Sequence, residues 1–243
     1  MSNLAIELNN DVIAKQTMNI ILLIDKSGSM RGHKMDEVNA AIKEIINYLR
    51  ALQADNANVN FDLSLMTFGT QAEWINEEPI NVDNYNFDDI ESKGTTNLHG
   101  AYRLLNEKLL KKSQGGMMPD FGGIAPIIIL LTDGHPNNGP WKKELENLET
   151  KPWFRVALRY GIAIELQDQK AIDVLNAYTS QNGEVIKVLD ANILKQIIKI
   201  IVLTASKVQS TSSNTVTQGT VKKVDMVRQQ IIENITDVDD WEW

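Results

Sequence analysis

Residues 20–30 read IILLIDKSGSM, in which five apolar side chains run straight into Asp25 and two serines follow at every second position. An uninterrupted apolar run of this kind is typical of a strand that is covered on both faces of a parallel sheet. In an extended segment, side chains at positions i, i+2 and i+4 point the same way. We therefore expect Asp25, Ser27 and Ser29 to direct three oxygen atoms at one point beyond the end of the strand.

Similar apolar runs recur along the chain and alternate with helical periodicity. We predict strands at 19–25, 61–69, 125–134, 155–166 and 184–189. Apolar residues at steps of three and four predict helices over 33–52, 98–109 and 193–204. An AEWI run after residues 69–71 predicts a hairpin that adds one antiparallel edge strand. This order predicts an α/β fold with a doubly wound, mostly parallel six-stranded sheet, helices on both faces and one antiparallel edge strand.

Composition excludes several classes of protein. The 243 residues contain no cysteine, which excludes disulfides, thiolate metal sites and cysteine nucleophiles. The net charge of −8 at pH 7 argues against a nucleic-acid partner, which would need clustered Lys and Arg. We find no secretory signal and no apolar run approaching the roughly 20 residues of a membrane span. We therefore expect a cytoplasmic protein that has no membrane partner.

The main domain is expected to cover residues 19–207, after an N-terminal extension at 1–18. A polar, Ser/Thr-rich linker is expected at 208–220, and an amphipathic helix with an acidic tail at 221–243. Trp241 and Trp243 in that tail are candidates for binding a groove on a partner protein. The alternatives are a helix that packs on its own domain, and a tail whose acidic side chains reach a metal site.

Two further motifs could complete a metal site with the DKSGS motif. The strand IILLTDG ends at Asp133, and Thr95 and Thr96 stand just before a helical pattern in SKGTTNLHGA. Ligands of open α/β sheets bind at the carboxyl ends of the strands. Carboxylate and hydroxyl oxygens suit a small hard cation such as Mg²⁺. A turn with a helix N-cap is the other explanation of the serines, but the three motifs together favour a metal site.

In this order, the three motifs resemble the metal-ion-dependent adhesion site of von Willebrand factor type A (VWA) domains, over roughly residues 19–207. The resemblance implies a Rossmann-like fold and the metal ligands Asp25, Ser27, Ser29, Thr96 and Asp133. Thr96 is assigned because GTTNL aligns with the family's GGTPL-like stretch. Thr95 stays an alternative, because Lys93-Gly94-Thr95 stands where the family often has paired glycines. In such domains one coordination position is left for water or for a carboxylate of a partner protein.

LLIDKSGSM and the TDGHP run resemble, more narrowly, intracellular bacterial proteins of the tellurium-resistance TerY type. This resemblance implies a non-enzymatic, Mg²⁺-dependent protein–protein interaction module of a cytosolic stress-resistance or defence system. Its companions would be a protein kinase and a PP2C-type phosphatase, and the partner would offer an Asp or Glu to the metal. Mn²⁺ and Ca²⁺ are alternatives to Mg²⁺.

Two other functions stay open as alternatives. The first is an adaptor for a MoxR-type AAA+ ATPase, which is a role of many bacterial VWA domains. The second is a Mg²⁺-dependent phosphohydrolase with Asp25 as the nucleophile. Haloacid-dehalogenase-like phosphatases carry a second Asp two residues on, where this chain has Ser27, and this disfavours the second alternative.

The chain has three histidines, and each lies within four residues of a proposed metal ligand. His33, His99 and His135 are therefore candidates for partner contacts at the rim of the site. The simpler explanation is that loops at the start of helices tolerate histidine, and we favour it because the oxygen ligands already suit a hard metal.

Overall fold

The computed structural model describes residues 15–55, 59–134, 136, 139–166, 168–180, 183–188, 194, 196, 198–201 and 229. A seven-stranded sheet forms its centre, in the order β3-β2-β1-β5-β6-β7, with β4 also paired to β2. The strands are β1 (Gln16–Asp25), β2 (Val59–Phe68), β3 (Ala72–Trp74), β4 (Ile80–Asn81), β5 (Ile127–Thr132), β6 (Leu158–Ile164) and β7 (Gly183–Val188). All pairs are parallel except those that β3 and β4 make with β2.

The predicted parallel strands and antiparallel edge strand are therefore confirmed, and β4 is an addition. Only two residues, Ile80 and Asn81, form β4, so the sequence offers no periodicity from which to predict it. The segment predicted as a strand at 155–166 begins later, because residues 152–156 form the short helix α4, which starts at a proline.

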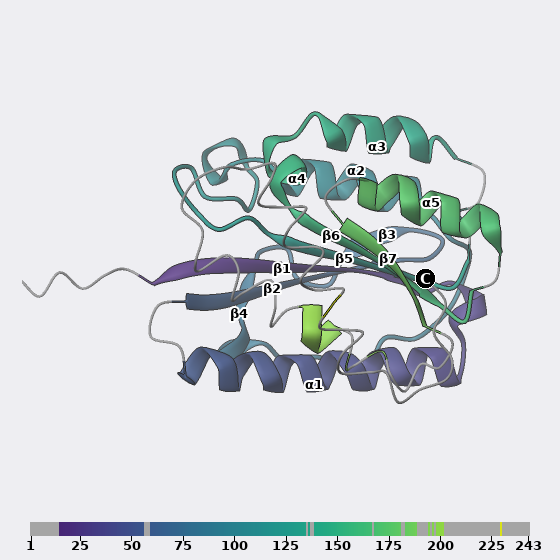
Figure 1. The fold of residues 1–243 in the computed structure, drawn as a ribbon, viewed down its shortest axis with the longest axis horizontal. Helices are drawn as coiled ribbons and strands as arrows, with labels where there is room; N and C mark the ends of the chain where they lie inside the picture. Colours follow the sequence, from purple (N-terminus) through teal and green to yellow (C-terminus); the bar gives the residue numbers. More distant parts are fainter. Residues whose placement is uncertain are drawn as a thin grey trace, which may run out of the picture.

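Helices cover both faces of the sheet (Figure 1). α1 (His33–Asp55) lies on one face, and α2 (Leu98–Lys108), α3 (Trp141–Glu149), α4 (Pro152–Val156) and α5 (Gln169–Thr179) lie on the other. β1 contributes to both cores, since Ile20 packs in the cluster on the α1 side and Ile21 in the cluster on the opposite side. Both side chains are fully buried, which explains why the strand is apolar at each position from Ile20 to Ile24.

The predicted domain boundaries stay predictions, and the described residues cover only part of them. β1 begins at Gln16, three residues before the predicted start of the domain at 19. The predicted helix at 193–204 is described only in part, and Leu194, Ile198 and Ile201 are buried in the core on the α1 side. The linker at 208–220 and the tail with Trp241 and Trp243 lie outside the described residues. No helix in the described part of the chain is long and apolar enough to cross a membrane.

The direction in which successive strands are added to the sheet reverses between β1 and β5. From β1 the chain leads to β2 on one side, and from β5 it leads to β6 on the other. Ile24 is paired with Leu131, so the residues that follow them, Asp25 and Thr132, come together at the carboxyl edge. This is the position at which open α/β sheets bind ligands.

Candidate metal centre

Asp25 is the last residue of β1, and its carboxylate is held at both oxygens. The backbone N–H of Ser27 donates to Oδ1 at 2.8 Å. The hydroxyl of Thr132, at the end of the neighbouring strand β5, donates to Oδ2 at 2.6 Å. Asp25 is fully buried, so this carboxylate has a fixed orientation in a region from which water is largely excluded.

The two serines connect the loop after β1 to the loop after β5. Ser27 Oγ lies 3.1 Å from Ser29 Oγ, and Ser29 Oγ donates to Asp133 Oδ1 at 2.7 Å. The Asp133 side chain is only 1% exposed. Its other oxygen, Oδ2, accepts a hydrogen bond of 2.7 Å from Lys34 Nζ in the first turn of α1.

The loop before α2 is tied to the loop after β1 by backbone hydrogen bonds. Gly28 N donates to Gly94 O at 2.9 Å, and Lys93 N donates to Lys26 O at 2.7 Å. Gly94 has φ +88°, and a Cβ at this position would lie 2.2 Å from Thr70 Oγ1, so a glycine is required here. Thr96, two residues on, is buried at 8% exposure, whereas Thr95 is exposed. This difference favours Thr96 over Thr95 as a ligand that faces the interior of the site.

The electrostatics of the site favour a bound cation. Burial raises the pKa of Asp25 to about 6, against the opposing effect of the hydrogen bonds from Thr132 and Ser27. The nearby Asp133 carboxylate makes a smaller contribution in the same direction as burial. A divalent cation between the two carboxylates would relieve both the burial penalty and their repulsion.

The donor set fits a hard metal ion. In the part of the chain that the structure describes, no three His, Cys, Asp or Glu side chains form a group that could hold a metal. A cation at this place would thus be held by carboxylates and hydroxyls together. All of these donors are oxygen atoms, which Mg²⁺ prefers.

The histidines differ in their relation to the site. His99, in the first turn of α2, packs against the loop that follows Asp133, since a Cβ on Gly139 would lie 2.3 Å from His99 Nδ1. His33 is 60% exposed and has Glu37 at 3.9 Å as its acidic neighbour, so it does not join the ligand cluster. His135, like Trp241 and Trp243, lies outside the described residues.

Sequence reasoning missed two residues that touch the proposed ligands, Thr132 and Lys34. Thr132 carried a usable signal, because it stands beside Asp133 at the end of a strand expected to run next to β1. Lys34 carried none, because its contact with Asp133 joins residues 99 positions apart in the chain.

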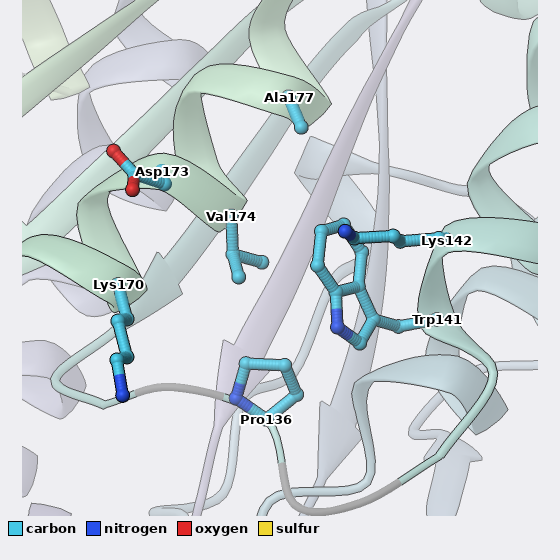
Figure 2. A pocket seen from close by; sticks show the side chains of 7 residues that line it. All are labelled: Pro136, Trp141, Lys142, Lys170, Asp173, Val174 and Ala177. Carbon is cyan, nitrogen blue, oxygen red and sulfur yellow. The ribbon is translucent and has the colours of Figure 1, made fainter.

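A pocket of about 460 Å³ lies between α3 and α5. Its lining includes Pro136, Trp141, Lys142, Lys170, Asp173 and Val174, and Figure 2 shows the indole of Trp141 and the side chain of Val174 on either side of the pocket. The Asp173 carboxylate accepts a hydrogen bond from Gln169, and the two lysines give the pocket a positive rim. Pro136 is three residues from Asp133, so the pocket and the candidate metal centre share one loop.

The chain was compared with protein families and with known proteins. Residues 19–200 match the model of the von Willebrand factor type A domain family. Inter-alpha-trypsin inhibitor heavy chain H1 of Sus scrofa is 31% identical over 134 residues, which are 52% of this chain and 14% of that protein. The magnesium-chelatase 67 kDa subunit of Heliobacterium mobile is 29% identical over 75% of this chain and 27% of that protein. The chain thus spans less than a third of the length of either relative.

Solved structures show the same fold. Proximal thread matrix protein 1 from the mussel byssus, solved with a zinc-occupied MIDAS motif, superposes with a TM-score of 0.55 at 18% identity, over 79% of this chain and 48% of that one.

Proposed function

The chain belongs to the von Willebrand factor type A family, and from this membership and the site geometry we propose that it is a non-enzymatic, Mg²⁺-dependent protein-interaction module. Asp25, Ser27, Ser29, Thr96 and Asp133 are the proposed ligands. The observation that carries the proposal is the set of hydrogen bonds joining these loops, in which Thr132 holds Asp25 and Ser29 contacts both Ser27 and Asp133. Mn²⁺ and Ca²⁺ are the alternative ions, since they also bind oxygen ligands.

The recognition step follows from charge. When bound, the metal supplies a concentrated positive charge that two aspartates only just neutralise, so an Asp or Glu of a partner protein gains strong electrostatic attraction. Thr132 and the Ser27 backbone keep Asp25 in one orientation, so that the site is formed before the partner arrives. The positive rim of the neighbouring pocket, with Lys142 and Lys170, adds attraction for the acidic surface around that residue.

The experiment that tests this function is a calorimetric titration of the protein with Mg²⁺, followed by capture of partners from a cell lysate in Mg²⁺ and in EDTA. Asp25→Ala is expected to lose both the metal and the partner. Asp89→Asn is the matched control, because it removes an exposed carboxylate that pairs with Lys43. A partner that stays bound in EDTA and to Asp25→Ala would contradict the proposal.

We further propose that the module acts in a cytosolic bacterial stress-resistance or defence system of the TerY type. LLIDKSGSM and TDGHP support this assignment, and its companions would be a protein kinase and a PP2C-type phosphatase. An adaptor role for a MoxR-type AAA+ ATPase is the alternative. Mass spectrometry of the captured partners separates the two, since one outcome yields a kinase or phosphatase and the other a AAA+ ATPase.

A further inference from the structure

Lys34 is a charged neighbour of the proposed metal ligands that their function does not use. Its Nζ donates to Asp133 Oδ2 at 2.7 Å and lies 3.7 Å from Glu165 Oε2. The Lys34 side chain is 22% exposed, whereas the Asp133 side chain is 1% exposed, so this ion pair is largely shielded from solvent. Lys26, although it follows Asp25 directly, pairs instead with Glu73.

The two oxygens of Asp133 therefore have different neighbours. Oδ1 accepts a hydrogen bond from Ser29, another proposed ligand, and Oδ2 accepts one from Lys34. A metal at Oδ1 would lie one carboxylate away from a fixed ammonium group. Like charges at this separation repel, and they repel strongly where burial lowers the dielectric constant.

We propose that Lys34 is a resident counter-cation of the metal centre, which weakens Mg²⁺ binding and so makes firm metal retention depend on an additional anionic ligand. The inference rests on the proposed metal-binding function. With Asp25, Asp133 and Lys34 counted together, the protein contributes one net negative charge to a divalent ion. Apart from the charge that Glu165 offsets, the loaded site therefore keeps a positive charge, which a partner carboxylate neutralises.

Glu165 limits this effect of Lys34. It follows β6 with φ +48°, an uncommon conformation for a residue other than glycine, and its backbone N–H donates to Val188 O at 2.6 Å. This backbone hydrogen bond holds Glu165 in the strained conformation in which its carboxylate lies near Lys34. Glu165 thus offsets part of the ammonium charge.

A purely positioning role for Lys34 predicts the opposite result. If the lysine only held Asp133 in place, its removal would leave Mg²⁺ affinity unchanged or lower. As a counter-cation, its removal raises the affinity. The sign of the change therefore separates the two roles.

The test is calorimetric titration of the full chain with Mg²⁺ alone. Lys34→Met keeps an unbranched side chain up to the ε position but removes the ammonium group, and it is expected to bind Mg²⁺ roughly tenfold more tightly than the wild type. Lys43→Met is the matched control, because it removes the same charge from the same helix at an exposed pair with Asp89, and it is expected to leave the affinity unchanged. Lys34→Gln repeats the test with a polar side chain, should Lys34→Met fold poorly by circular dichroism.

Glu165→Gln completes a double-mutant cycle. It is expected to weaken Mg²⁺ binding in the wild-type background and to have a smaller effect when Lys34 is already Met, because its main influence passes through the ammonium. Equal or weaker Mg²⁺ binding by both Lys34 variants overturns the counter-cation role while leaving the metal centre intact. No Mg²⁺ binding by the wild type or by either Lys34 variant overturns the proposed function itself, and this inference with it.

Discussion

Replacing Asp25 by Asn is expected to stabilise the metal-free protein at neutral pH, although it removes a proposed metal ligand. The substitution keeps the shape of the side chain. Its Oδ1 can still accept from Ser27 N, and its Nδ2 can donate to Thr132 Oγ1, whose own proton can go to Gly134 O at 3.1 Å. What changes is the charge of a fully buried group.

The magnitude follows from the pKa of Asp25. Burial raises this pKa from 3.8 to about 6, and each unit corresponds to about 1.4 kcal/mol, so ionisation of Asp25 destabilises the metal-free fold by about 3 kcal/mol. Because the folded protein binds this proton more tightly than the unfolded chain, the penalty is absent below about pH 4 and complete above about pH 6. The free energy of unfolding of Asp25→Asn should therefore exceed that of the wild type by up to about 3 kcal/mol at neutral pH, and by little at about pH 4.

The assay is urea denaturation of both proteins in EDTA at neutral pH and near pH 4, repeated with Mg²⁺ at neutral pH. Mg²⁺ at about 100 times its dissociation constant would stabilise the wild type by about 2.7 kcal/mol and the variant far less. The stability advantage of the variant in EDTA should then shrink or vanish in Mg²⁺. A metal-free variant that is less stable than the wild type at neutral pH would refute this reasoning.

Three further predictions concern the same loops. The Mg²⁺ affinity measured by calorimetry should fall as the pH drops below about 6, because protons compete with the metal for Asp25, whose pKa is raised to about 6. An affinity that stays flat down to about pH 5 would contradict this prediction. Thr132→Val removes the hydroxyl that lowers the pKa of Asp25, so that pKa should rise and Mg²⁺ binding should weaken roughly tenfold. Calorimetry across pH measures the effect, and Thr150→Val, at an exposed helix end, is the control. Gly94→Ala places a methyl group at φ +88° and against Thr70 Oγ1. It should lower the free energy of unfolding by about 1–3 kcal/mol more than Gly115→Ala, because Gly115 has a similar φ but open space around it. Equal losses in the two variants would show that the contact with Thr70 does not matter.

The sequence predicted those parts of the fold that depend on local pattern. The apolar run of β1 is covered on both faces, and its neighbour β5 ends beside it. α3 and α5 were not predicted. In α3, only Leu145 and Leu148 of the nine residues are buried. A helix that is short and buries only two residues offers few apolar positions from which to recognise it. α5 buries Ile172, Leu175 and Tyr178 at steps of three, so its periodicity was readable in the sequence.

For the site, the motifs were enough to propose the ligands but not the residues around them. Burial now favours Thr96 over Thr95, an alternative that the sequence left open. Lys34 meets Asp133 and Glu165 only because α1 and the ends of β5 and β6 come together at one edge of the sheet. Contacts of this kind follow from the tertiary structure, and no spacing in the chain encodes them.

The backbone hydrogen bonds that tie the loops together, from Lys26 N to Phe68 O, Gly28 N to Gly94 O and Lys93 N to Lys26 O, also bear on how fast the site would fill. Because these loops are already fixed, little chain has to be ordered when an ion arrives, and the three amides should exchange slowly with solvent deuterium with or without metal. The slow step of association is then the release of water from the ion itself, and Mg²⁺ dehydrates reluctantly. Association should accordingly be faster for Ca²⁺ than for Mg²⁺, so that the ion and not the protein sets the rate.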